Sequence, residues 1–188
     1  MKILCFISSL GNGGAERQLA TLGAGLVKRG HEVRFLVYHP HGHFLPLLQE
    51  AGISCHVIPP CSVWLRALAV RRILRRSWQD VVLAFMESPC LYAKLATIPS
   101  QRWGLVLGER SSDPAMMTVR GRFIRYFHRF ADSVVCNSHT THLMLAKGYP
   151  WLKSKLITVY NTVDLQLMRN RPAVPSYGEG CGYGRMAE

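Results

Sequence analysis

Short runs rich in Val, Ile, Leu and Phe recur along the chain, separated by intervals that have room for a helix. They lie at residues 3–7, 33–38, 54–58, 81–85, 105–107, 133–136 and 156–159. Runs that are apolar on both faces are typical of buried parallel strands. Because parallel strands need crossover connections, the alternation predicts an α/β domain: a Rossmann-like, open and mostly parallel sheet with helices on both faces.

Helical periodicity is present near the start of the chain and absent from its end. Between the first two runs Leu19, Leu22, Leu26 and Val27 recur at helical spacing, and Gly30 ends the pattern. The stretch RNRPAVPSYGEGCGYGRMAE has no such periodic apolar face. We therefore expect one domain over residues 1–166 and a linker or disordered tail over residues 167–188.

The composition limits the partners and the compartment. The chain has 23 Lys and Arg against 11 Asp and Glu, a formal charge of +12, which favours an anionic partner. Its six cysteines form no C-x-x-C pair, as expected for reduced thiols in the cytoplasm and not for a disulfide scaffold or a zinc knuckle. No apolar stretch reaches the roughly 18 residues of a membrane span.

A glycine-rich turn follows the first apolar run. The sequence SSLGNGGAER at residues 8–17 places Gly11, Gly13 and Gly14 immediately before a helix pattern. Glycines permit close approach of the backbone to a ligand, and the free N–H groups of a helix start attract anions. The turn therefore suits a phosphate, although a tight turn without a ligand would use the same residues.

Several common sites are disfavoured by the sequence. A dinucleotide site would need a carboxylate after the second run, which ends in VYHPH, and the P-loop string G-x-x-x-x-G-K-[ST] is absent. His39, His41 and His43 alternate, but alternating side chains in an extended loop do not converge on a tetrahedral metal centre. We expect no metal site.

Four strings together resemble the N-terminal domain of family-4 glycosyltransferases. They are GNGGAERQLATLGAGLVKRGHEV from residue 11, GERSSDP from residue 108, ADSVVCNSHTT from residue 131 and ITVYNTVD from residue 157. The resemblance implies half of a GT-B fold, in which two Rossmann-like domains face each other across a cleft. It also implies a retaining, mostly metal-independent transfer from a nucleotide sugar to a lipid-linked or cell-envelope glycan.

The resemblance also assigns roles to residues. Gly13 and Gly14 would face the donor diphosphate, and Glu109 and Arg110 are the candidate catalytic residues, although Arg110 could instead pair with Asp113. The remaining candidates for the nucleotide side of the cleft are Gly11, Glu16, Asn137, Ser138 and Asn161. Helix and loop capping would also explain the last three.

One feature of the family is missing from these residues. Its C-terminal donor domain carries two glutamates separated by seven residues, and no two glutamates of this chain have that spacing. A truncated or frameshifted reading frame, or a separate chain that supplies the donor domain, would explain the difference. We expect little catalysis by this chain alone.

Two arginine-rich segments indicate which partners the chain contacts. In WLRALAVRRILRRSW, from residue 64, one helical side is apolar at Ala67, Val70, Ile73 and Leu74. The opposite side carries Trp64, Leu65, Leu68, Arg71, Arg72, Arg75 and Arg76. Arginines mixed with Trp and Leu predict contact with an anionic membrane at the inner face of the plasma membrane, and a plain basic surface helix is the alternative.

In the second segment, residues 120–130, we expect the aromatic stripe of Phe123, Tyr126, Phe127 and Phe130 to lie in the core, with Arg122, Arg125 and Arg129 outside. The alternative function is a non-catalytic module that binds anionic lipid or a partner chain. Nucleic acid is a weaker partner because no recognised binding motif is present.

Overall fold

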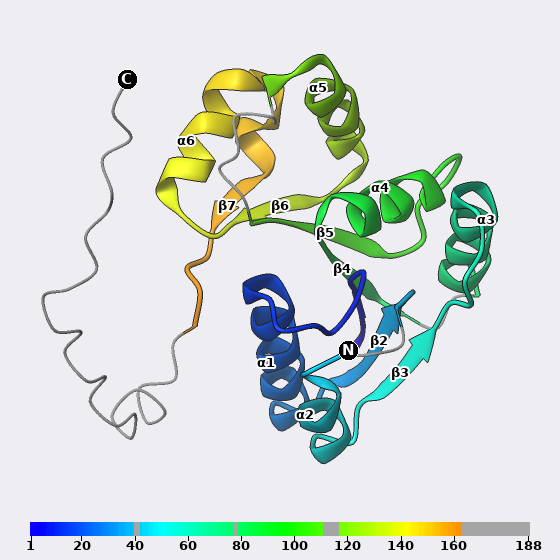
Figure 1. Cartoon of the computed structure of the whole chain (residues 1–188). Coiled ribbons are helices and arrows are strands. Elements are labelled where there is room, and N and C mark those ends of the chain that lie inside the picture. The colour runs from blue at the N-terminus through cyan, green and yellow to red at the C-terminus, as the bar shows by residue number, and fades with distance from the viewer. Residues whose placement is uncertain (40–41, 77–78, 111–116, 163–188) are drawn as a thin grey trace, which may run out of the picture.

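The computed structural model describes residues 1–39, 42–76, 79–110 and 117–162, which form one seven-stranded parallel sheet with the strand order β3-β2-β1-β4-β5-β6-β7 (Figure 1). The strands are β1 (Lys2–Phe6), β2 (Glu32–Val37), β3 (Ser54–Val57), β4 (Val81–Phe85), β5 (Gly104–Glu109), β6 (Ser133–Cys136) and β7 (Leu156–Thr158). Each of the seven apolar runs contributes one strand, and the predicted open, parallel α/β fold is confirmed.

Helices cover both faces of the sheet (Figure 1). The helices are α1 (Gly14–Lys28), α2 (Leu45–Glu50), α3 (Val63–Leu74), α4 (Glu87–Ala96), α5 (Val119–Tyr126) and α6 (His139–Gly148), and the 3-10 turns are η2 (Phe127–Phe130) and η3 (Pro150–Lys155). On one face Ile3 and Cys5 pack with Leu19 of α1, and on the other Leu4 and Phe6 pack with Val70 of α3. Strands apolar on both sides are buried between two helical layers.

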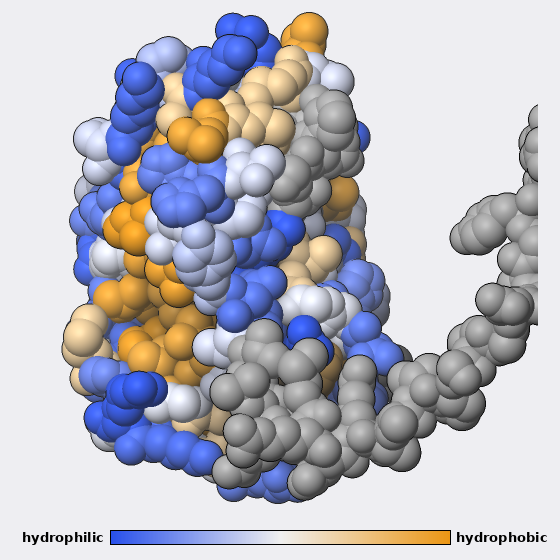
Figure 2. Space-filling model, turned by 90° about the vertical axis from the view of Figure 1, so that its left-hand side faces the viewer, coloured by the Kyte–Doolittle hydropathy of each residue, from blue (hydrophilic) through white to orange (hydrophobic). Residues whose placement is uncertain are grey.

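The cover is unequal along the sheet. In the described part of the chain α1 and α2 lie against the half of the sheet that contains β1 to β3 (Figure 1). On the other half Val106 and Val135 are half-buried and Ile157 of β7 is 48% exposed. A band of apolar side chains runs down the side of the molecule where α6, β7 and α1 lie (Figure 2).

The strand order creates a switch point between β1 and β4. From β1 the chain moves outward through β2 and β3, and it then returns to pair β4 with the other side of β1. The helices after β1 and β4 therefore lie on opposite faces, so the chain turns away in opposite directions after these two paired strands. Open α/β sheets bind ligands at such a point.

A buried charged cluster fixes α5 and η2 against β5 and α4. The Glu109 carboxylate accepts hydrogen bonds from Arg125 Nη2 at 3.1 Å and from His128 Nε2 at 2.8 Å. Lys94 Nζ lies 3.0 Å from His128 Nδ1 and donates to the Ile124 carbonyl at 2.8 Å. Lys94 is fully buried and His128 is 1% exposed, so each charge in the cluster depends on these partners.

Burial also shifts the titration of the cluster. It lowers the pKa of Lys94 to about 8 and lowers the pKa of His128, although the hydrogen bond to Glu109 opposes the second shift. Burial alone would raise the pKa of Glu109, but the hydrogen bond and charge of His128 and the charge of Arg125 outweigh it and lower that pKa.

The aromatic stripe does not lie in the core, so that prediction is wrong. Phe123 is 63% exposed and Tyr126 is 52% exposed, whereas Arg125, predicted outside, is buried at 5%. The reason is the buried charged cluster. Arg125 and His128 point inward to bind Glu109, so the aromatic side of α5 and η2 faces solvent.

The stability of the fold is expected to fall as the pH drops below about 6.5, the ordinary pKa of histidine. Because His128 has a lowered pKa in the folded chain, the unfolded chain takes up that proton first. Glu109 adds a further loss below its ordinary pKa, about 4.3, for the same reason. Urea unfolding between pH 7 and pH 5 measures the slope.

His128→Gln should flatten that slope, and the exposed His56→Gln should leave it unchanged. Equal slopes for the two variants would contradict a buried, neutral His128.

Two glycines of α1 are expected to respond oppositely to alanine. A Cβ on Gly23 would lie 2.7 Å from Cε2 of the buried Phe35 ring, whereas a Cβ on Gly25 would meet only Arg29 Nη1 at 3.7 Å. Gly23→Ala should lower the free energy of unfolding by about 1–3 kcal/mol through overpacking. Gly25→Ala should raise it by up to about 1 kcal/mol through helix propensity. Stabilisation by both would show that α1 and β2 are not in close contact.

Candidate active site at the carboxyl edge of the sheet

The glycine-rich turn forms the start of α1. Gly13 is the N-cap residue and offers no side chain to the free N–H groups of the first turn. Asn12 and Gly14 are exposed, and a Cβ on Gly14 would meet nothing within 4 Å. None of the three glycines has a positive φ, so an unusual turn conformation does not explain them, and the space beside the backbone is open at Gly14. The helix start is therefore open to an anion.

Glu16 lies inside this turn. Its Oε2 atom is 2.1 Å from the position that a Cβ on Gly13 would occupy. Glu16 is the third residue of α1, the position from which a glutamate reaches back to the start of a helix. The carboxylate thus complements the positive end of the helix dipole in the absence of another anion.

The ends of β1 and β4 are tied together at the switch point. Ser8 Oγ donates a hydrogen bond to Met86 Sδ at 3.3 Å. Met86 has φ 73° and ψ 158°, a left-handed backbone conformation that is rare for a residue with a side chain. Strained residues of this kind concentrate at functional sites, and neither residue was predicted from the sequence.

Arg110 follows β5 at the same edge. Its Nη1 donates to Asn161 Oδ1 at 2.7 Å, and its guanidinium carbon lies 4.1 Å from the centroid of the Phe85 ring at the end of β4. Asn137 Nδ2 donates to the Arg110 carbonyl at 3.2 Å. Burial lowers the pKa of Arg110, which nevertheless remains a cation. Asp113, the alternative partner, lies outside the described residues.

Asn137 and Ser138 also organise the start of α6. Ser138 Oγ accepts a hydrogen bond from the Thr141 backbone N–H at 3.2 Å, which is an ordinary N-cap. Thr141 Oγ1 lies 3.5 Å from Asn137 Oδ1 and 3.0 Å from Ser138 Oγ. The capping explanation thus accounts for Ser138, while Asn137 also fixes the backbone of Arg110.

A strap joins the last strand to the first helix. Gln18 Nε2 donates to the Thr162 carbonyl at 2.8 Å, and Gln18 Oε1 accepts from the Thr162 backbone N–H and hydroxyl, each at 2.9 Å. The partners are 144 positions apart in sequence. The strap places Asn161, and with it Arg110, on the side of the sheet where α1 begins.

Glu109 ends β5 but turns into the buried cluster with Arg125 and His128, and its side chain is 13% exposed. Both carboxylate oxygens are occupied there. The geometry favours a positioning role, in which Glu109 anchors the strand end that carries Arg110. Its predicted catalytic role is not tested by these contacts and stays a prediction.

The arginine-rich segment forms α3 and the turn after it. Val70 and Leu74 are buried, and Trp64, Leu65 and Leu68 are 81%, 58% and 52% exposed, as the helical pattern predicted. The helix ends at Leu74, so Arg75 and Arg76 do not continue the helical face as expected. Arginines and Leu68 line an open hollow of about 400 Å³.

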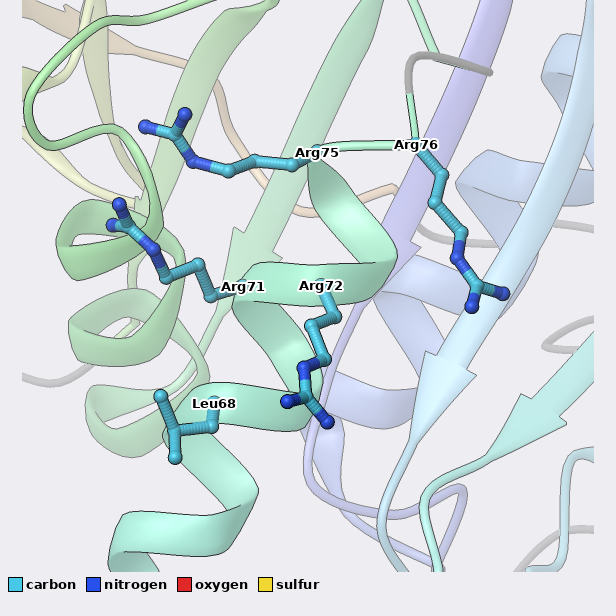
Figure 3. A pocket seen from close by; sticks show the side chains of 5 residues that line it. All are labelled: Leu68, Arg71, Arg72, Arg75 and Arg76. Carbon is cyan, nitrogen blue, oxygen red and sulfur yellow. The ribbon is translucent and has the colours of Figure 1, made fainter.

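The four arginines of the hollow divide into two pairs. Arg71 and Arg75 extend toward α4, whereas Arg72 and Arg76 turn away from it (Figure 3). Arg71 donates to the carbonyls of Leu95 and Ile98, and Arg75 to those of Ile98 and Ser100. Carbonyls at the end of a helix lack backbone partners and attract cations, so Arg71 and Arg75 stabilise the end of α4.

Other features of the described chain concern metals, thiols and membrane spans. Within the described ranges no three His, Cys, Asp or Glu side chains gather closely enough to hold a metal ion. His41 is not among the described residues. The described cysteines, Cys5, Cys55, Cys61, Cys90 and Cys136, are free thiols. None of the described helices has the length and apolar character needed to cross a membrane.

Solved structures share this fold. HepE of Anabaena, crystallised with UDP and glucose, superposes with a TM-score of 0.73 at 22% identity, over 89% of this chain and 46% of HepE. MurG of Acinetobacter baumannii superposes with a TM-score of 0.61 at 14% identity, over 92% of this chain and 49% of MurG. The sheet and its helices therefore have the architecture of one half of a GT-B fold.

Sequence similarity identifies the family. A Campylobacter jejuni protein, GalNAc-α-(1→4)-GalNAc-α-(1→3)-diNAcBac-PP-undecaprenol α-1,4-N-acetyl-D-galactosaminyltransferase, is 30% identical over 138 residues, which are 66% of this chain and 36% of that protein. The chain thus spans half or less of the length of the relatives it matches. Residues 12–167 match the pattern of Glycosyltransferase Family 4, and the chain belongs to that family.

Proposed function

We propose that this chain is the N-terminal, acceptor-side domain of a retaining glycosyltransferase that transfers a sugar from a nucleotide sugar to a lipid-linked or cell-envelope glycan. The observation that carries the proposal is the meeting of two anion-attracting groups at one sheet edge. These are the start of α1 at Gly13 and Gly14 and the guanidinium of Arg110. The Gln18–Thr162 strap and the Arg110–Asn161 hydrogen bond connect them through the segment after β7.

The chemistry of the proposal is electrostatic. Negative charge builds on the nucleoside diphosphate as it leaves the sugar, and fixed N–H groups that point at it lower the barrier. The backbone N–H groups at Gly13 and Gly14 would supply this stabilisation, with Glu16 displaced from the helix start when the diphosphate binds. In this proposal backbone dipoles take the place of a metal ion, and transfer that persists in EDTA would support it.

Arg110 and Asn161 would contact the sugar or the acceptor. Arg110 is held in place by two contacts. Its guanidinium packs on the Phe85 ring, and its backbone carbonyl accepts a hydrogen bond from the Asn137 side chain. Relatives named for transfer to undecaprenyl-diphosphate-linked sugars support a lipid-linked acceptor. HepE, crystallised with UDP and glucose, supports a uridine nucleotide as donor.

The proposal includes a place at the membrane. Trp64, Leu65 and Leu68 are exposed on α3, and Arg72 and Arg76 follow on the same segment. Apolar and basic side chains on one exposed helix are typical of contact with an anionic bilayer. We propose that α3 holds the protein at the inner face of the plasma membrane, where a lipid-linked acceptor is available.

Arg110→Ala in the full protein should lower sugar transfer to an undecaprenyl-diphosphate-linked acceptor by roughly tenfold to a hundredfold, the value of one charge-assisted hydrogen bond. The matched control is Arg102→Ala, which removes an exposed arginine before the opposite end of β5. Equal transfer rates for the two variants would show that Arg110 does not contribute to the active site. The anomeric configuration of the product, measured by NMR, tests the retaining mechanism.

A polypeptide of residues 1–188 is expected to show negligible transfer with any of several nucleotide sugars, because one wall of a cleft cannot align both substrates. Rapid turnover by this polypeptide would overturn the acceptor-side assignment. Vesicle binding by a full protein that transfers no sugar would favour a non-catalytic lipid-binding module, which could also recruit a separate chain.

Replacing Arg72 and Arg76 by alanine should weaken binding to phosphatidylglycerol vesicles by roughly thirtyfold, since each basic residue contributes about 1 kcal/mol at an anionic surface. The loss should shrink as salt rises. Lys28→Ala with Arg29→Ala, on α1 across the sheet, removes the same charge as a control. Equal binding by both double variants would show that α3 does not face the membrane.

A further inference from the structure

Helix α5 and turn η2 present aromatic side chains to solvent. Phe123 is 63% exposed, Tyr126 is 52% exposed and Val119, at the start of α5, is 86% exposed. Phe127 and Phe130 of η2 are half-buried next to them. Large apolar side chains gathered on an exposed surface mark a contact with another molecule or with a membrane.

The aromatic rings form one fixed patch. The ring centroids of Phe123 and Phe127 are 5.3 Å apart, those of Tyr126 and Phe127 are 5.8 Å apart, and those of Phe127 and Phe130 are 6.2 Å apart. From beneath, Arg125 and His128 anchor the segment to Glu109. The rings are therefore held outward by the buried cluster, so their exposure follows from the fold.

The rim of the patch is basic. The segment VRGRFIRYFHRF of α5 and η2 contains arginines at 120, 122 and 129 beside the buried Arg125, and no acidic residue. The Arg129 guanidinium lies 4.7 Å from the centroid of the Tyr126 ring, which keeps a cation at the edge of the patch. Arg120 is paired with the exposed Glu87 at 3.3 Å, a weak surface contact.

The patch lies on the same side of the sheet as α3. Helix α4 lies between the two and is largely buried, with α3 packed on one side and η2 on the other. The arc of α3, α4 and α5 in Figure 1 therefore presents α3 and α5 as its outer surfaces. Each of these outer helices combines exposed apolar side chains with arginines.

We infer that α5 is a second membrane-contacting surface, which inserts Phe123 and Tyr126 into the interface of an anionic bilayer. The inference rests on the proposed function for the role of the membrane, and it adds an element that α3 does not supply. Aromatic rings prefer the headgroup region, and arginines bind anionic headgroups. A second copy of this chain would bring like charges together, which disfavours a homodimer through this face.

The two contacts would act differently. Binding through Arg72 and Arg76 is electrostatic and weakens with salt, whereas insertion of Phe123 and Tyr126 is apolar and does not. Two separated contacts also restrict how the sheet tilts on the bilayer. Both α3 and α5 begin where the chain returns from the carboxyl edge of the sheet, so the site and the membrane would lie near each other.

The test measures partition of the full chain onto vesicles of phosphatidylglycerol and phosphatidylcholine at low and at high salt. Phe123→Ser with Tyr126→Ser should lower partition by roughly a hundredfold, about tenfold for each aromatic ring withdrawn from water. The loss should persist at high salt, unlike that of the Arg72 and Arg76 variant. The matched control is Leu143→Ser, since Leu143 of α6 is 66% exposed.

Unchanged partition of the aromatic variant, with unfolding curves like those of the unaltered chain, would overturn the inference. A dimer in sedimentation that the aromatic substitutions dissociate, without effect on partition, would also overturn it and assign the patch to a second copy. Transfer to a water-soluble acceptor analogue by the full protein, which includes a donor domain, should be the same with and without the substitutions. Absence of transfer in both forms of the full protein would refute the proposed function and leave the vesicle result valid.

Discussion

Parallel strand pairing is the constraint on which the rest of the structure depends. Because every strand runs in the same direction, each connection must cross a face of the sheet, and the carboxyl ends of the strands meet at one edge. The glycine turn, Met86, Arg110 and Asn137 all follow strand ends, so they gather at that edge although the sequence separates them widely. The edge is thus a product of topology before any side chain contributes chemistry.

The fold was predictable because burial on two faces leaves a clear mark in the sequence. Runs such as residues 81–85 are short, apolar at consecutive positions and rich in β-branched and aromatic residues, as strands covered on both sides are. The orientation of α5 was not predictable in the same way. Its apolar residues are half aromatic, and its polar buried face depends on Glu109, Lys94 and His128, which come from other elements. Tertiary ion pairing overrode the helical pattern.

The site was predictable in part. Glycines before a helix pattern indicate an anion-binding turn from local sequence alone. The contacts of Arg110 with Phe85 and Asn161 join separate strand ends, and no local pattern encodes such a pairing. Gln18 gave no signal because a glutamine on a helix is ordinarily solvated, and only its partner Thr162 explains why it is buried. Met86 was missed because a backbone dihedral angle has no counterpart in residue type.

The contact between Gln18 and Thr162 also fixes an exit point. Both backbone polar groups of Thr162 are bound to a side chain of the first helix, so the polypeptide leaves the sheet from a defined position and not from a frayed strand end. That position lies over α1, the helix whose first turn is open to an anion. A single glutamine thereby joins the first helix to the backbone at residue 162, across 144 positions of sequence.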